Sequence, residues 1–261
     1  MEENLSLPIG VKPFRVRTRE AWDAFLAGER ELRALMDQKD REAVSEPLVS
    51  RCAELLSPAF SNPAFELGRG GEKYELILSP EGDRTRLFQL AGFVAALDLE
   101  GWARSGDPEN ACERWSAYQG EPSQAEDWAP RQDVYAGVTC CVPLINAYFQ
   151  GDNYYMDRLH QDGVIPGFFY YPLDGVDRKD ILDLRDQLEQ AITARCGEGI
   201  VTFTGGSTGT SLGYLDFIAW DLKTLLDAAA EVFGGAPVDW AAFHTFRGDS
   251  DGIGLKQRKE A

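Results

Sequence analysis

Asp216 and His244 have the side-chain types needed for general acid–base chemistry. Asp216 lies inside the aromatic run YLDFIAWD, and His244 lies in the later run WAAFHTF. A histidine can act as a base when a nearby carboxylate orients its ring. One alternative for this chain is therefore a hydrolase that uses Asp216 and His244.

A structural role is open for both side chains. Alternation along a strand places Asp216 on the same face as Tyr214 and Ile218. A carboxylate on a half-buried face costs free energy unless it is hydrogen-bonded or paired. If it is not catalytic, Asp216 is expected to bond to a backbone amide or to an arginine. His244 is expected in the same way to bond to a neighbour in the sheet.

A glycine-rich run, GGSTGTS, begins at Gly205 and contains Gly206 and Thr208. Phosphate-binding loops aim backbone N–H groups at an anion from the start of a helix. Here residues 212–219 read as a strand, and G-K-[ST] is absent. The run is therefore interpreted as a wide hairpin loop, whose tip is a candidate contact surface. A small-ligand or regulatory module with this loop as its lip is another alternative.

The sequence predicts neither a metal site nor a cofactor. There are five cysteines and two histidines, and no C-x-x-C pair occurs. Zinc ligands would need a recognisable spacing of such residues. Asp249-Ser-Asp251-Gly resembles the start of a calcium loop, but the run does not continue with the ligands that such a loop requires. An odd number of cysteines without motif spacing is typical of reduced thiols in the cytoplasm.

Aromatic residues are a further group of candidates for binding. They are dense between residues 149 and 171, where Tyr154 and Tyr155 stand together in a polar stretch. Aromatic side chains are frequent at the energetic centres of protein interfaces, but packed cores use them as well. Tyr154 and Tyr155 are therefore predicted contact residues, with core packing as the alternative.

The second half of the chain has the clearer secondary-structure pattern. Residues 163–247 predict the order β-α-β-β-α-β, in which apolar positions alternate in the strands and recur at helical spacing between them. This order is that of the ferredoxin-like arrangement, with both helices on one face of an antiparallel sheet. The predicted fold class is α+β, and residues 248–261 are predicted to be a mobile tail.

Residues 1–150 are predicted to form an N-terminal α+β half with two leading helices. Ser45 is expected to cap the second helix, with Pro47 in its first turn. Residues 134–142 read as a strand and residues 151–163 as a linker. When the two halves of the sequence are aligned so that Tyr74 matches Tyr214, a predicted hairpin, a predicted helix and a tryptophan also fall at similar positions in both halves. Duplication of a β-β-α-β unit explains this similarity, and convergence of similar units explains it equally.

The charge of the chain limits its partners. Its 43 acidic and 26 basic residues give a net charge of −17. Nucleic acids and anionic membranes are repelled by such a field, whereas a cationic protein is attracted. No run approaches the length of a membrane span, and the N-terminus lacks the pattern of a secretory signal. A soluble cytoplasmic protein is expected, although acidity also serves solubility alone.

The motif G-G-S-T-G-T-S-x-x-Y-x-D-F-x-x-W-D, followed by W-A-A-F-H-T-F-R, resembles uncharacterised bacterial proteins that are encoded beside polymorphic toxins and regarded as their immunity proteins. The resemblance covers about residues 163–247. It implies inhibition by binding, in which the protein covers the active site of a toxin, and it assigns no role to any residue. We therefore expect a cytoplasmic protein that is not an enzyme and that inhibits a basic protein partner.

Overall fold

The computed structural model describes residues 10–97, 108–123 and 129–257. These residues form eight helices and nine strands. Every pair of neighbouring strands is antiparallel, so the predicted α+β class is confirmed. The helices are α1 (Phe14–Met36), α2 (Arg41–Leu56), α3 (Arg84–Ala95), α4 (Pro108–Cys112), α5 (Val142–Gln150), α6 (Tyr154–Gln161), α7 (Ile181–Cys196) and α8 (Leu222–Gly235). The strands are β1 (Phe65–Gly70), β2 (Lys73–Leu78), β3 (Ser116–Gln119), β4 (Val134–Thr139), β5 (Ile165–Pro172), β6 (Val201–Gly209), β7 (Leu212–Ala219), β8 (Ala241–Thr245) and β9 (Ile253–Lys256).

Seven of the strands form one sheet in the order β3-β4-β6-β7-β5-β8-β9. The predicted order β-α-β-β-α-β is present as β5-α7-β6-β7-α8-β8. Its four strands are the middle of the sheet, which β4 and β3 extend on one side and β9 on the other. The ferredoxin-like prediction therefore does not describe the complete sheet, because strands from both halves of the chain build it.

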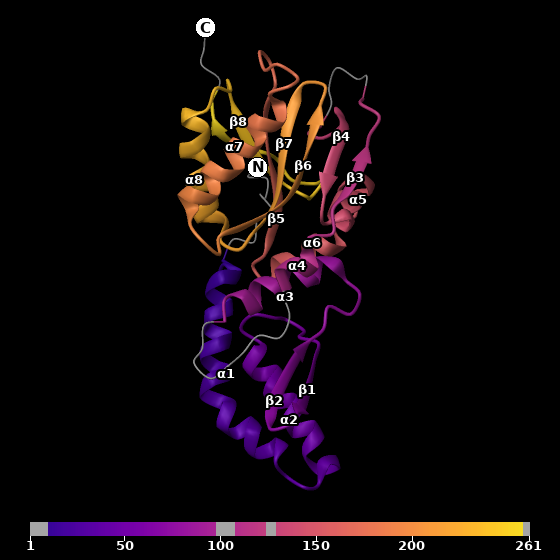
Figure 1. Cartoon of the computed structure of the whole chain (residues 1–261), viewed down its shortest axis with the longest axis vertical. Coiled ribbons are helices and arrows are strands. Elements are labelled where there is room, and N and C mark those ends of the chain that lie inside the picture. The colour runs from indigo at the N-terminus through magenta and orange to yellow at the C-terminus, as the bar shows by residue number, and fades with distance from the viewer. Residues whose placement is uncertain (1–9, 98–107, 124–128, 258–261) are drawn as a thin grey trace, which may run out of the picture.

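The two faces of this sheet carry different side chains. One face packs against α7 and α8 through buried apolar residues such as Phe169, Leu215 and Phe217, and we call it the apolar face (Figure 1). The opposite face lies toward α5 and α6 and carries Tyr214 and Asp216, and we call it the polar face. Because successive strand residues point to opposite sides, the two sets alternate along each strand.

The N-terminal elements extend away from the sheet. Helix α1 runs from the end of the sheet to the far end of the molecule, where α2 and the β1–β2 hairpin pack beside it (Figure 1). Trp22 stacks on Phe93 of α3 with ring centroids 4.3 Å apart, and its indole nitrogen donates to the Phe93 carbonyl. Phe14 contacts both Phe60 and Trp220, so one continuous core joins α1 to the sheet.

Several local predictions in the first half were wrong. Asp40, rather than Ser45, caps α2 by accepting from the amide of Ala43, and Pro47 lies inside the helix. The strand predicted for residues 134–142 ends at Thr139, and a helix, α5, follows it. The segment predicted as a linker at residues 151–163 contains a second short helix, α6.

The tail and the duplication also differ from their predictions. Residues 253–256, predicted as part of a mobile tail, form β9 and pair with β8. Strands β1 and β2 form a separate two-stranded sheet, and the next strand, β3, lies in the seven-stranded sheet. In the first half the strand after the β-β-α part therefore lies in a different sheet from its hairpin, whereas β6, β7 and β8 share one sheet. Trp102, the tryptophan of the first half that was aligned with Trp240, lies outside the described residues.

No helix in the described segments combines the length and the apolar character needed to cross a membrane. The longest, α1, has 23 residues but includes charged residues along its length, and its buried positions fall on one side. Such a helix is amphipathic and suits the surface of a globular core.

Candidate functional site

Asp216 is completely buried on the polar face and pairs with a buried arginine, Arg131. The guanidinium donates from one nitrogen to Oδ1 at 2.5 Å and from the other to Oδ2 at 3.3 Å. Both side chains have no exposed surface. Burial disfavours the charged guanidinium, but the negative charge of Asp216 overrides this effect and raises the pKa of Arg131. Of the structural roles expected for Asp216, pairing with an arginine is the one observed.

Arg131 reaches Asp216 from a tight turn just before β4. The amide of Gln132 donates to the carbonyl of Ala129, and Pro130 and Arg131 are the two central residues. Arg131 has φ of 73°, a left-handed conformation that type II turns require at this position and that glycine usually supplies. An arginine held there costs about 1 kcal/mol or more, so other contacts of the residue must hold it in place.

Aromatic rings provide those contacts, and a second carboxylate, Asp133, fixes one of the rings. The guanidinium lies 5.0 to 5.4 Å from the ring centroids of Phe168, Tyr214 and Phe246, within the range of cation–π attraction. The Tyr214 hydroxyl accepts from the backbone amide of Arg131 and donates to Asp133 at 2.5 Å. Asp133 also accepts from two amides of the β6–β7 turn. The turn before β4 is thus tied to β7 at several points.

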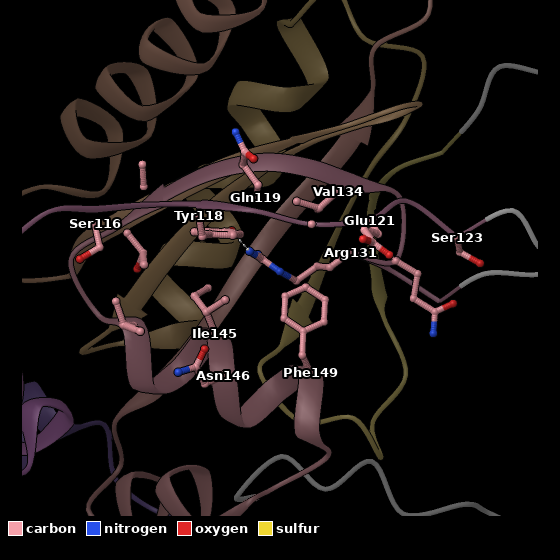
Figure 2. A pocket seen from close by; sticks show the side chains of 15 residues that line it. Ser116, Tyr118, Gln119, Glu121, Ser123, Arg131, Val134, Ile145, Asn146 and Phe149 are labelled. Atoms are coloured by element: carbon pink, nitrogen blue, oxygen red, sulfur yellow. Dashed lines mark hydrogen bonds between the residues drawn. The ribbon is translucent and has the colours of Figure 1, made fainter.

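A pocket of about 600 Å³ lies beside this network, between α5 and the strands β3 and β4 (Figure 2). Figure 2 shows Ile145 and Phe149 rising from α5 toward the strands, and Tyr118 meeting the end of Arg131. The Tyr118 hydroxyl accepts from the guanidinium at 2.6 Å. The lining is Ser116, Ala117, Tyr118, Gln119, Gly120, Glu121, Ser123, Arg131, Gln132, Val134, Thr139, Val142, Ile145, Asn146 and Phe149.

The charge balance of the pocket is negative. Two of its lining residues are charged, Arg131 and Glu121. Arg131 is neutralised by Asp216, whereas Glu121 is exposed and carries no ion pair with another described residue. The pocket therefore combines apolar and aromatic walls with one uncompensated carboxylate at its rim, which suits a group with an apolar stem and a positive end.

His244 does not contact Asp216. In the sheet register, Phe168 of β5 is the direct partner of Asp216 on one side and of His244 on the other. The ring of Phe168 stacks on His244 with centroids 5.3 Å apart, and Nδ1 of His244 lies 2.6 Å from the carbonyl of Thr245. The two residues lie on the same face, but the hydrogen bond that the hydrolase alternative requires is not formed. A sheet histidine bonded to a neighbour is what the structure contains.

The glycine-rich run is strand rather than loop. Strand β6 continues through Gly209, so Gly205, Gly206 and Thr208 pair with β4 and β7 in the interior of the sheet. Gly205 has φ of 146° at a bulge, and a Cβ there would lie 2.1 Å from the carbonyl of Val138. The glycines allow close packing of backbones. The predicted wide loop was wrong, and with it the lip of a ligand site.

Tyr154 and Tyr155 lie on α6, away from the pocket lining. Tyr154 is 56% exposed, and Arg158 lies over its ring. Tyr155 is partly buried against the core. The structure thus leaves Tyr154 available for contacts but does not bring it together with Asp216, His244 or the glycine-rich run.

The exposed aromatic residue that lines the pocket is instead Phe149 on α5, and further exposed apolar residues lie on β4 or directly before β3. Trp115 is 56% exposed, and Tyr135, Val138 and Phe149 are exposed as well. This group, Arg131 and Tyr118 were not among the site residues predicted from the sequence. Residues 100–131 read mostly as a polar insertion with a possible short strand at residues 115–118, which the structure has as β3 at Ser116–Gln119. The partner of Asp216 had no periodic signal in this segment. The requirement that a buried carboxylate find a cation was the available clue.

Comparisons with protein families, curated proteins and solved structures find no match to this chain. Within the described ranges, no three histidine, cysteine or acidic side chains are grouped so that they could hold a metal ion. The pocket, the exposed apolar side chains near β3 and β4, and the charge of the chain are therefore the features that bear on function.

Proposed function

We propose that this chain binds a basic protein partner in the cytoplasm and inhibits it, as an immunity protein inhibits a toxin. The observation that carries the proposal is the exposed apolar group at the β3–β4 edge, formed by Trp115, Tyr135, Val138 and Phe149. Its member Phe149, on α5, lines a pocket whose uncompensated charge is negative, in a chain with a net charge of −17. Large aromatic side chains such as tryptophan and tyrosine are frequent among interface hot spots.

The polar network beneath the pocket supports binding rather than catalysis. Asp216 receives two hydrogen bonds from Arg131, and the pair is screened by aromatic rings. A catalytic carboxylate must reach the reacting group directly or through one water. A carboxylate that is fully buried and accepts two hydrogen bonds instead stabilises the walls of a rigid surface. Preformed surfaces lose less entropy on association.

The proposal also predicts how the partner arrives. Opposite charges on two proteins accelerate their encounter, and salt screens this attraction. With a basic partner, the association rate should fall by about tenfold or more between low and physiological salt, while the dissociation rate should change little.

The test is an inhibition assay against a basic toxin domain, chosen from the genes that neighbour the gene of this chain. Purified chain is titrated against that domain, and the activity of the domain is measured together with the association rate at two salt concentrations. We expect stoichiometric inhibition with salt-dependent association. Full activity of the domain at saturating concentrations of this chain would contradict the proposal.

A matched pair of variants locates the contact. Trp115→Ala should weaken inhibition by about tenfold or more, as expected for a hot-spot aromatic residue. Tyr154→Ala is the control, because Tyr154 is also 56% exposed but lies on α6. A loss with Tyr154→Ala and none with Trp115→Ala would place the contact on α6 instead.

A further inference from the structure

Strand β3 is the last strand on its side of the seven-stranded sheet, and one of its edges has no strand partner among the described residues. The amide of Gly120 donates to the carbonyl of Tyr135 on β4. The N–H and C=O groups of successive residues alternate in direction along a strand. The backbone groups of Tyr118 therefore also point toward β4, whereas those of Ala117 and Gln119 point outward. Both residues are exposed.

Edge strands of this kind usually carry a protecting device, such as a proline, a bulge or a lysine. Residues 116–119 read Ser-Ala-Tyr-Gln and contain neither a proline nor a charge. Their pairing with β4 runs without a register shift. The edge can therefore accept an additional strand, which is a recurring mode of peptide recognition.

The pocket begins at the same edge. An added strand would lie about 4.8 Å outside β3, and its alternate side chains would point to the polar face. On that face they would reach the hollow bounded by Tyr118, Phe149 and Glu121. In Figure 2, Glu121 lies at the side of the hollow where the chain leaves β3, and Phe149 lies below it.

The chemistry of the hollow selects the side chain that enters it. A lysine or arginine places its apolar stem against aromatic and aliphatic walls while its charged end meets a carboxylate. Glu121 provides that carboxylate, and the positive charge of Arg131 is cancelled by Asp216. An acidic side chain would find no free cation among the described lining residues.

We propose that β3 takes an extended segment of a basic protein as an additional strand, with one lysine or arginine side chain of that segment in the pocket beside Phe149 and Glu121. The proposal rests on the proposed function and adds to it the place and the mode of contact. Pairing with a second copy of this chain is disfavoured, because two molecules of charge −17 repel each other.

The first test uses a defined peptide and needs no natural partner. The probe is a blocked heptapeptide that alternates lysine with valine, and its controls are the same peptide with glutamate for lysine and one with N-methyl groups along one backbone edge. Affinity is measured by calorimetry, and the backbone amide signals of Ala117 and Gln119 are followed by NMR. We expect those signals to shift and both control peptides to bind at least tenfold more weakly.

Three variants test the same contacts from the side of the protein. Ala117→Pro removes an outward-facing N–H and leaves the hydrogen bonds to β4 in place, and edge strands tolerate such a proline. It should weaken the binding of the peptide at least tenfold, with little change in the melting temperature of the protein. Glu121→Gln should weaken the binding of the peptide about fivefold. Glu113→Gln is the matched control, because Glu113 is exposed near β3 but does not line the pocket, and it should bind as the wild type does.

Other results would overturn the proposal. Equal binding of the N-methylated peptide, or of butylamine alone, would mean that the strand edge contributes nothing. A dimer in sedimentation that Ala117→Pro dissolves would assign the edge to a second copy. If Ala117→Pro fails to fold, the N-methylated peptide still decides the question from the ligand side.

The toxin-domain assay separates this proposal from the function. Inhibition that Ala117→Pro and Glu121→Gln leave unchanged would keep the proposed function and remove the strand-edge site. Peptide binding at β3 by a chain that inhibits no toxin domain would keep the site and remove the function.

Discussion

The two faces of the seven-stranded sheet are built by the same strands but are stabilised in different ways. On β7, Leu215 and Phe217 enter a purely apolar cluster under α7 and α8. Their neighbours Tyr214 and Asp216 point to the other side, where they meet Arg131. A slip of one residue would exchange the two sets and leave Asp216 in the apolar cluster without a cation. The polar face thus favours one register, and the apolar face supplies burial.

Removing the charge pair should have the largest effect. Asp216→Ala leaves Arg131 charged and buried with no carboxylate, and breaking a buried pair in this way costs about 3–5 kcal/mol. The free energy of unfolding should fall by that amount in urea denaturation. The variant Asp227→Asn is the control, because Asp227 pairs with Lys223 on the surface, and we expect no measurable change from it.

A double replacement distinguishes stability from register. Arg131→Met combined with Asp216→Leu removes both charges and keeps apolar volume, which is often neutral or stabilising for buried pairs. If the charge pair selects the register in which β7 pairs with its neighbours, the double variant should be as stable as the wild type, but its β7 residues should give broader NMR signals. Sharp, unshifted signals would limit the pair to a packing role.

Acid should destabilise the chain through His160, which lies on the side of the polar face. Burial, together with the positive charge of Arg247, lowers the pKa of His160 on α6 from 6.5 to about 4, and the opposing effects of Asp157 and Asp249 are smaller. The unfolded chain therefore binds a proton below pH 6.5 that the folded chain takes up only near pH 4. Stability is complete above pH 6.5 and is lost as the pH falls, by about 2 kcal/mol at pH 5.

The measurement is urea unfolding at pH 7 and pH 5, with His160→Leu as the variant that removes the titrating ring. The variant should lose about 2 kcal/mol less than the wild type between the two values. Equal losses in both proteins would show that other groups carry the acid sensitivity.

The contrast between the faces also explains what the sequence could predict. Strands β5, β7 and β8, the first part of β6, and helices α7 and α8 follow from periodic patterns, because the apolar face needs only alternation and helical spacing. The glycine-rich second part of β6 has no such pattern and was predicted as a loop. The partner of Asp216 does not, because Arg131 is 85 residues away, in a turn whose conformation is unusual for arginine. Helices α5 and α6 are short and rich in aromatic residues, so propensity gave no clear signal.

Two buried tyrosines give a finer test, one on each face. Tyr214 on the polar face donates to Asp133 and accepts from the amide of Arg131. Tyr214→Phe leaves both groups without this partner in a buried site, at a cost on the order of 1.5 kcal/mol. Urea denaturation measures the loss, and an unchanged midpoint would mean that Asp133 and the amide find other partners.

Tyr171 on the apolar face should behave differently, although it is as fully buried as Tyr214. Its hydroxyl has no hydrogen-bond partner in the described part of the chain, and burial raises its pKa above the ordinary range of tyrosine. A hydroxyl without a partner contributes nothing that phenylalanine lacks, so Tyr171→Phe should change stability by less than about 0.5 kcal/mol or increase it. The same urea denaturation, run beside Tyr214→Phe, measures the difference. Equal losses in the two variants would contradict the comparison, because the apolar face would then also depend on a hydrogen bond.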